Sequence, residues 1–138
     1  MLRAGYRCEY CLIEGWELQV DHIIPRARKD TAGGADVEVP DDLDHPLNLA
    51  AACSHCNRHK RDFVTGRSIL FGGTHRLFNP RRDLWHEHFA WSEDYQRILP
   101  LSAIGDATVQ RLEMNARIFR RQRDLLRRAA HTGGPAWP

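Results

Sequence analysis

The chain has 138 residues, enough for one modest domain with a helical appendage but too short for two independent hydrophobic cores. Charged residues make up 28% and hydrophobic residues 42%, which excludes a fibrous or wholly disordered protein. No apolar run approaches the ~20 residues that span a bilayer, and residues 1–8 lack the apolar core of a signal peptide. We therefore expect a cytoplasmic protein with no membrane partner.

The formal net charge is only +2, but the charges are unevenly distributed along the chain. Residues 28–45 contain six acidic residues, whereas residues 111–128 contain seven arginines against Glu113 and Asp124. A basic segment beside an acidic loop is typical of a protein that binds nucleic acid and also gathers a cation. A solvated helix surface explains the arginines equally well.

In chain order, the first predicted element is a strand at residues 17–24, which is rich in β-forming side chains. This strand places Asp21 and His22 near its end. Residues 26–46 are polar and rich in Gly, Asp and Pro, which indicates a loop. A helix is predicted to begin near Asn57.

The C-terminal half begins with a cluster of aromatic side chains, Trp85, Phe89 and Trp91. Aromatic residues at this spacing favour burial in a core over stacking on nucleic-acid bases. Two helices are predicted after this cluster, capped by Asp106 and Asn115, with many of their arginines facing outward.

Four cysteines form two Cys-x-x-Cys pairs separated by 41 residues: Cys8, Cys11, Cys53 and Cys56. In a reducing compartment such pairs indicate thiolate metal ligands rather than disulfides. Four thiolates suit a tetrahedral Zn²⁺ and leave no position for water, so the predicted zinc is structural. Free cysteines, disulfides and a redox-active pair are the alternatives.

Three short segments between and after the cysteines carry further polar residues: VDHIIP at 20–25, LNL at 47–49 and CSHCNRHK at 53–60. Cleaving a phosphodiester requires an activated water and positive charge beside the phosphate oxygens. The Asp21 carboxylate suits Mg²⁺ or Mn²⁺, and His22 can accept a proton near neutral pH. This set of residues is therefore compatible with hydrolysis of nucleic acid.

Residues 3–62 resemble the HNH nucleases, in particular their zinc-stabilised four-cysteine branch with the ββα-metal fold. The resemblance implies that Asp21 binds the catalytic cation and His22 is the general base, and that Asn48 fixes the intervening loop so that the imidazole is properly oriented. Asn57 takes the third motif position, where the family carries a metal-binding His or Asn, which makes this chain an H-N-N variant. It also implies products with a 5′ phosphate and a 3′ hydroxyl.

The implied cofactors are therefore a structural Zn²⁺ and a catalytic Mg²⁺ or Mn²⁺. His59 is a secondary candidate for the catalytic site, although two residues of helix turn it away from Asn57. His45 and His55 are expected to be surface residues. Contacts to phosphates are expected from a set of basic residues, Arg26, Arg28, Lys60, Arg61 and Arg81.

The predicted fold class is α+β, with an HNH core and a mainly helical, arginine-rich extension. We expect the core at residues 1–66, the extension packed on it at 67–130 and a disordered tail at 131–138. The predicted function is a metal-dependent endonuclease acting on nucleic acid, with DNA as the expected substrate and a homodimer if both strands are cut. The alternatives are a catalytically inactive zinc module that binds nucleic acid or protein, and a purely structural zinc protein.

Overall fold

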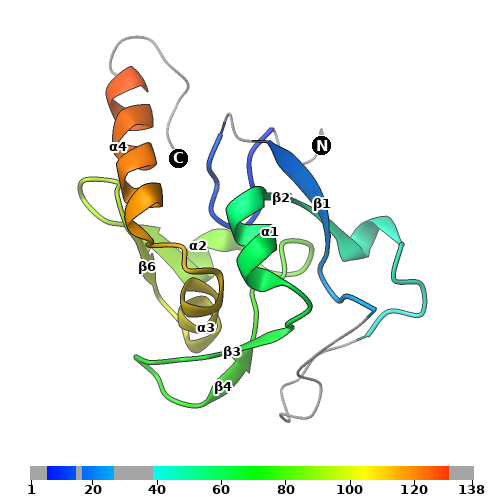
Figure 1. Ribbon diagram of the computed structural model, residues 1–138. Coiled ribbons are helices and arrows are strands. Elements are labelled where there is room, and N and C mark those ends of the chain that lie inside the picture. The colour runs from blue at the N-terminus through cyan, green and yellow to red at the C-terminus, as the bar shows by residue number, and fades with distance from the viewer. Residues whose placement is uncertain (1–5, 15–16, 27–38, 131–138) are drawn as a thin grey trace.

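The computed structural model describes residues 6–14, 17–26 and 39–130 (Figure 1). The helices and strands follow in the order β1 (Leu18–His22), η2 (Pro46–Asn48, a 3₁₀ turn), β2 (Leu49–Cys53), α1 (Ser54–Lys60), β3 (Thr65–Arg67), β4 (Thr74–Arg76), α2 (Trp85–His88), β5 (Phe89–Trp91), β6 (Ile98–Pro100), α3 (Ala103–Leu112) and α4 (Arg117–Ala130). The predicted tail, residues 131–138, lies outside the described residues. In the ranges that are described, no helix has both the length and the apolar composition needed to cross a bilayer.

The N-terminal part is an antiparallel strand pair followed directly by a helix. Strand β1 pairs with β2 so that Asp21 lies opposite Ala50 and His22 opposite Leu49. Helix α1 begins at Ser54, three residues before the predicted start, because the Cys53 side chain caps it by accepting a hydrogen bond from the Cys56 N–H. The sulfur that was expected to bind metal thus also determines where the helix begins.

The C-terminal part packs on this unit through helix α3. Strand β3 pairs with β4, and the backbone of Gly66 lies so close to α3 that a Cβ there would be 2.5 Å from the Ala107 carbonyl oxygen. Only glycine allows this approach. The predicted boundary at residue 66 falls inside β3, and the division into core and extension stays a prediction.

One hydrophobic cluster contains residues from both halves of the chain, including the four cysteines, Phe89, Leu112 and Phe119. The predicted burial of the aromatic cluster is confirmed, since Phe89 is 1% exposed and its ring lies 5.1 Å from that of Trp85. The Trp85 indole also donates a hydrogen bond to the Tyr10 carbonyl.

Neither predicted cap, Asp106 or Asn115, begins a helix. Helix α3 starts three residues before Asp106, because the Ser102 hydroxyl accepts a hydrogen bond from the Gly105 N–H. Asp106 lies inside α3 and is fully buried. Asn115 instead uses its side-chain amide to bond both backbone groups of Ile98. Hydrogen bonds to distant backbone groups therefore occupy the two side chains that the local sequence predicted to cap helices.

Candidate active site and metal centre

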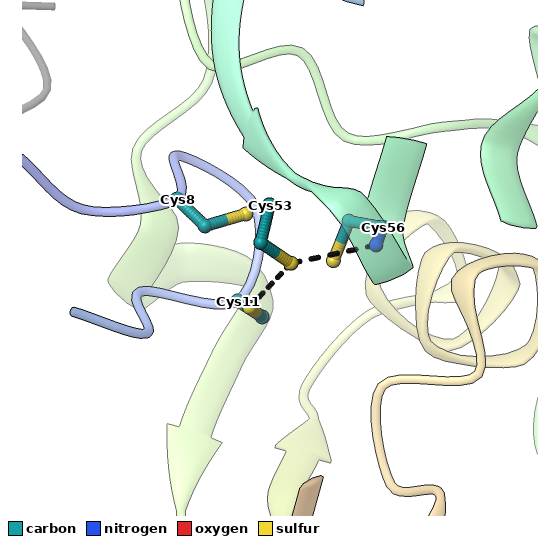
Figure 2. Close-up of side chains that lie close together, drawn as sticks. All are labelled: Cys8, Cys11, Cys53 and Cys56. Carbon is teal, nitrogen blue, oxygen red and sulfur yellow. Dashed lines mark hydrogen bonds between the residues drawn. The ribbon is translucent and has the colours of Figure 1, made fainter. Parts of the chain in front are cut away.

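The four cysteine side chains converge on one buried point from two segments of the chain (Figure 2). Their sulfur atoms all lie within 4.8 Å of one another, and the Cys11 and Cys53 sulfurs are 3.8 Å apart. Metal–sulfur bonds of about 2.3 Å in a tetrahedron place sulfurs about 3.8 Å apart. The cluster can therefore hold a tetrahedral metal ion, and an all-sulfur donor set suits zinc.

Backbone hydrogen bonds hold the two cysteine pairs together. The Cys8–Cys11 pair forms a tight turn in which the Leu12 N–H bonds the Cys8 carbonyl, and Leu12 has a positive φ of 64°. Glu9, inside this turn, donates its N–H to the Ala51 carbonyl and accepts the Ala51 N–H on its carboxylate. The first turn is thereby fixed against strand β2, beside Cys53.

Because the four cysteines are buried and close together, it is unfavourable for several of them to be ionised at the same time. Burial raises the pKa of Cys11 well above its ordinary value. Hydrogen bonds from the Cys11, Cys56 and Cys8 thiols lower the pKa of Cys53. Several thiolates together would repel one another here unless a cation lay between them, which is the chemistry of a metal site.

A second feature is an open polar pocket of about 280 Å³, lined by residues at the end of β1 and by Asn57 of α1. It brings together Asp21, His22 and Asn57, three of the residues that the sequence singled out. The remaining lining residues are Val20, Pro25, Arg61 and Asp62. Strand β1 supplies the first two polar groups at adjacent positions, and α1 supplies Asn57.

Asp21 is 4% exposed and is held by two neighbours. The Tyr10 hydroxyl donates to one carboxylate oxygen at 2.6 Å, and the Lys60 ammonium lies 3.3 Å away. Burial raises the pKa of Asp21, and the charge of Lys60 and the hydrogen bond from Tyr10 offset only part of this rise. The carboxylate is thus firmly positioned at the edge of the pocket.

His22 is positioned through its ring by an acidic residue of the long loop. Its Nε2 lies 2.8 Å from an Asp44 carboxylate oxygen, and the other oxygen of Asp44 accepts a hydrogen bond from Arg26 at 2.8 Å. The hydrogen bond to His22 and the nearby guanidinium of Arg26 lower the pKa of Asp44. Asp44 is therefore the side chain that touches the imidazole.

Asn48 acts on the backbone rather than on the histidine ring. Its amide oxygen accepts the Ile24 N–H at 2.9 Å, and its amide nitrogen donates to the carbonyls of Ile24 and Leu43 at 3.0 and 2.7 Å. Asn48 is 3% exposed. These bonds join the segment after His22 to the end of the long loop.

Asn57 and His59 face different surroundings. The Asn57 amide nitrogen donates to the Gln19 side chain at 2.7 Å, and the Asn57 amide oxygen takes no part in this hydrogen bond. His59 lies 2.8 Å from the Glu113 carboxylate and is stacked on His55, so it does not line the pocket with Asp21. The expectation that His55 is a surface residue is wrong, because His55 is 6% exposed and bonds the carbonyls of the α3 C-terminus.

The expected phosphate contacts fall into different environments. Arg61 lines the pocket and Arg26 is 73% exposed, so both are accessible to an anion. The expected phosphate contact of Lys60 is wrong, because this side chain is 1% exposed and its ammonium faces Asp21. Arg81 is also mostly buried, in an ion pair with Glu9. Arg28 lies outside the described residues.

Three residues at the site were not singled out from the sequence: Tyr10, Asp44 and Asp62. Tyr10 holds Asp21, Asp44 holds His22, and Asp62 lines the pocket. The position of Asp62, two residues after the end of the helix that carries Asn57, was a usable signal for a residue near the pocket. Tyr10 and Asp44 gave no comparable signal, since their contacts cross 11 and 22 residues of chain.

An antiparallel strand pair and a following helix that carry Asp21, His22 and Asn57, beside four cysteines that can hold a metal ion, are typical of the ββα-metal class of nuclease folds. Comparison with protein-family models agrees, since residues 8–63 match the HNH endonuclease model. The chain therefore contains an HNH endonuclease domain, and the predicted fold class and family resemblance are confirmed. No curated protein and no solved structure matched the chain.

Proposed function

We propose that the chain is a metal-dependent endonuclease that hydrolyses phosphodiester bonds in DNA. The observation that carries this proposal is the convergence of Asp21, His22 and Asn57 on one open polar pocket within the HNH domain. Each side chain has the chemistry that its proposed role needs. The four cysteines would hold a structural Zn²⁺ that keeps β2 and α1 in place.

A catalytic Mg²⁺ or Mn²⁺ fits the oxygen donors of this pocket. Asp21 offers a carboxylate, and Asn57 offers its amide oxygen because Gln19 occupies the amide nitrogen. Hard cations of this kind prefer such oxygen ligands. When bound, the cation would offset the negative charge that builds on the phosphate during hydrolysis.

His22 is the proposed general base. A neutral imidazole has one donor and one acceptor nitrogen, so an Nε2–H that donates to Asp44 leaves Nδ1 to accept a proton from water. The water oxygen attacks phosphorus as His22 takes its proton, the bond to the 3′ oxygen breaks, and solvent water protonates the released 3′ oxygen. The products carry a 5′ phosphate and a 3′ hydroxyl.

Substrate binding is assigned to accessible arginines near the pocket. Arg61 lies at the pocket and Arg26 is exposed beside His22, so both can contact phosphates that flank the cut. Contacts to phosphates position the backbone without reading its sequence. A single chain would nick a duplex, and cutting of both strands would require a homodimer.

The test is cleavage of supercoiled plasmid by wild type, His22→Ala and the control His86→Ala, whose side chain is exposed and away from the pocket. Reactions contain Mg²⁺ or Mn²⁺, or neither, and zinc content is measured for every sample. We expect wild type and His86→Ala to cut only with added cation, and His22→Ala to lose at least about 100-fold of the rate.

Undiminished cutting by His22→Ala would refute the assignment of the base. If wild type cuts neither plasmid, single-stranded DNA nor RNA but binds them, the domain is an inactive binding module. Measured zinc content separates loss of the structural metal from loss of the catalytic cation.

A further inference from the structure

A second cavity in the described part of the chain has a volume of about 310 Å³, and we call it the side cavity. Its apolar wall is formed by four residues, Ile24, Val39, Pro40 and Leu47. Two of these residues remain in contact with water, since Leu47 is 65% exposed and Val39 is 45% exposed. Apolar side chains that line a hollow and face water are typical of a ligand-binding surface.

The side cavity adjoins the proposed catalytic pocket. Ile24 lines the side cavity, whereas His22 and Pro25, on either side of it in the chain, line the catalytic pocket. Two residues of chain span at most about 7 Å, so the backbone of His22 is close to the wall of the side cavity. The Asn48 side chain fixes this segment, because it bonds both backbone groups of Ile24 at 2.9 and 3.0 Å. The two sites are therefore held close to each other.

The basic side of the side cavity is a hydrogen-bonded turn that begins at Asn79. The Asn79 side chain accepts the Arg81 N–H at 2.9 Å, and the Asn79 carbonyl accepts the N–H groups of Arg82 and Asp83 at 3.1 and 2.9 Å. The Asp83 carboxylate closes the turn by accepting the Asn79 N–H at 2.8 Å. Asn79, Arg81 and Arg82 all line the side cavity, so this turn determines where its polar groups lie.

The charges around the side cavity are complementary to a polyanion. Two arginines line it, and none of its described lining residues is acidic. Arg81 is mostly buried in an ion pair with Glu9, whereas Arg82 is exposed. Arg82 is therefore accessible to a phosphate or to the polar edge of a base.

A single nucleobase matches this combination of apolar wall and basic side. A base has two apolar faces and polar edges, and proteins bind unstacked bases against apolar side chains and arginine guanidinium groups. The volume is at the small end of the ~300–1,000 Å³ range of ligand pockets, which suits one planar ring system. A base is also attached to a phosphate, and the adjoining catalytic pocket is the proposed site of the phosphate that is cut.

We propose that the side cavity binds one unpaired base of the substrate, next to the phosphate that is cut. This inference rests on the proposed nuclease function of the adjoining pocket. A base in a duplex must leave its pair and its stack before it can enter such a cavity, which costs free energy. The preferred substrate is therefore nucleic acid that is single-stranded or locally opened at the cut.

Base binding is measured by fluorescence anisotropy with two labelled strands of equal length, oligothymidine and the same sugar-phosphate backbone without bases. All proteins carry His22→Ala, so that the strands are not cut, and the protein with this change alone is the parent. Leu47→Asn is the variant, and Leu84→Asn, at a leucine of similar exposure outside the side cavity, is its control. We expect the parent and Leu84→Asn to bind oligothymidine about tenfold more tightly than the abasic strand. Leu47→Asn should bind oligothymidine about fivefold more weakly than the parent does, and the abasic strand equally well.

Cleavage by chains that retain His22 provides a second measurement. A duplex with a short unpaired bubble is compared with the fully paired duplex of the same sequence, in Mg²⁺ or Mn²⁺. We expect wild type and Leu84→Asn to cut the bubble about tenfold faster, and Leu47→Asn to lose most of this preference. If Leu47→Asn does not fold, the comparison of Leu47→Ala with Leu84→Ala decides the question.

Equal affinity of the parent for the two strands, or equal cutting of the two duplexes by wild type, would overturn the inference. So would equal weakening by Leu84→Asn. Equal loss of affinity for both strands in Leu47→Asn would also overturn it, because the cavity would then hold the backbone and not a base. A chain that binds neither strand overturns this inference and the proposed nuclease together. A chain that cuts nothing but shows the expected affinities overturns only the proposed nuclease.

Discussion

The Lys60 ammonium lies 3.3 Å from the Asp21 carboxylate, and both side chains are almost fully buried. Lys60 also donates to the His22 carbonyl at 3.0 Å. The Lys60 ammonium at the end of α1 therefore holds the side chain of Asp21 and the backbone of His22, the two residues that strand β1 presents to the pocket. This gives Lys60 a positioning role in place of the phosphate contact that its sequence position indicated.

Replacing Lys60 by Met should lower the free energy of unfolding by about 3 kcal/mol, because it leaves the buried Asp21 carboxylate without its cation. Urea unfolding measures this loss. The control Arg58→Met removes an exposed cation from the same helix and should change stability by less than about 0.5 kcal/mol. Equal stabilities of the two variants would show that Asp21 does not depend on Lys60.

Replacing Asp44 by Asn should slow DNA cleavage at least about tenfold, because the imidazole of His22 loses the carboxylate that orients it. The fold should be unchanged, since both side chains are partly exposed. Single-turnover cleavage measures the rate, and Asp41→Asn in the same acidic loop is the control. A rate for Asp44→Asn equal to that of Asp41→Asn would exclude Asp44 as a positioning residue.

Asp106 should make stability depend on pH on the acid side. Burial acts to raise the pKa of Asp106, but hydrogen bonds from Leu70, Gln110, Ser68 and Ile69 outweigh it and hold the pKa below its ordinary value. A carboxylate with a lowered pKa in the folded state stabilises the protein above its unfolded pKa of about 3.9. That contribution is lost as the pH falls through the folded pKa.

Asp106→Asn should therefore cost about 2 kcal/mol at pH 7, and the difference from wild type should shrink below about pH 4. Thermal unfolding at a series of pH values tests this. The control Asp124→Asn changes a carboxylate that pairs with the exposed Arg128. A difference between wild type and Asp106→Asn that stays constant with pH would contradict the assignment.

Removal of the structural metal should destabilise the whole domain, because the four cysteines belong to the same hydrophobic cluster as the C-terminal helices. Chelation should lower the midpoint of thermal unfolding, and added Zn²⁺ should restore it. Cys11→Ser should show the low midpoint without chelator. A midpoint that does not respond to chelation would mean that the cluster folds as free thiols.

Much of the fold of the HNH domain could be predicted from local sequence. The β-forming run before Pro25 predicted a strand, which the structure places at Leu18–His22. The helix after the second cysteine pair was predicted near Asn57, but its start was wrong because a cysteine sulfur serves as the cap. The caps Asp106 and Asn115 were wrong for a related reason, since distant backbone groups compete for these side chains.

The sequence by itself determined the donor chemistry, because the cysteine pairs and the Asp-His pair are short motifs whose spacing is fixed by the chain. Only the tertiary structure decided which partner each polar group has. Lys60 and Asp21 are 39 residues apart in the chain, and Arg123 reaches the Gln96 carbonyl across 27 residues. Burial makes an unpaired charge costly, so packing, and not sequence position, selects the partners of these groups.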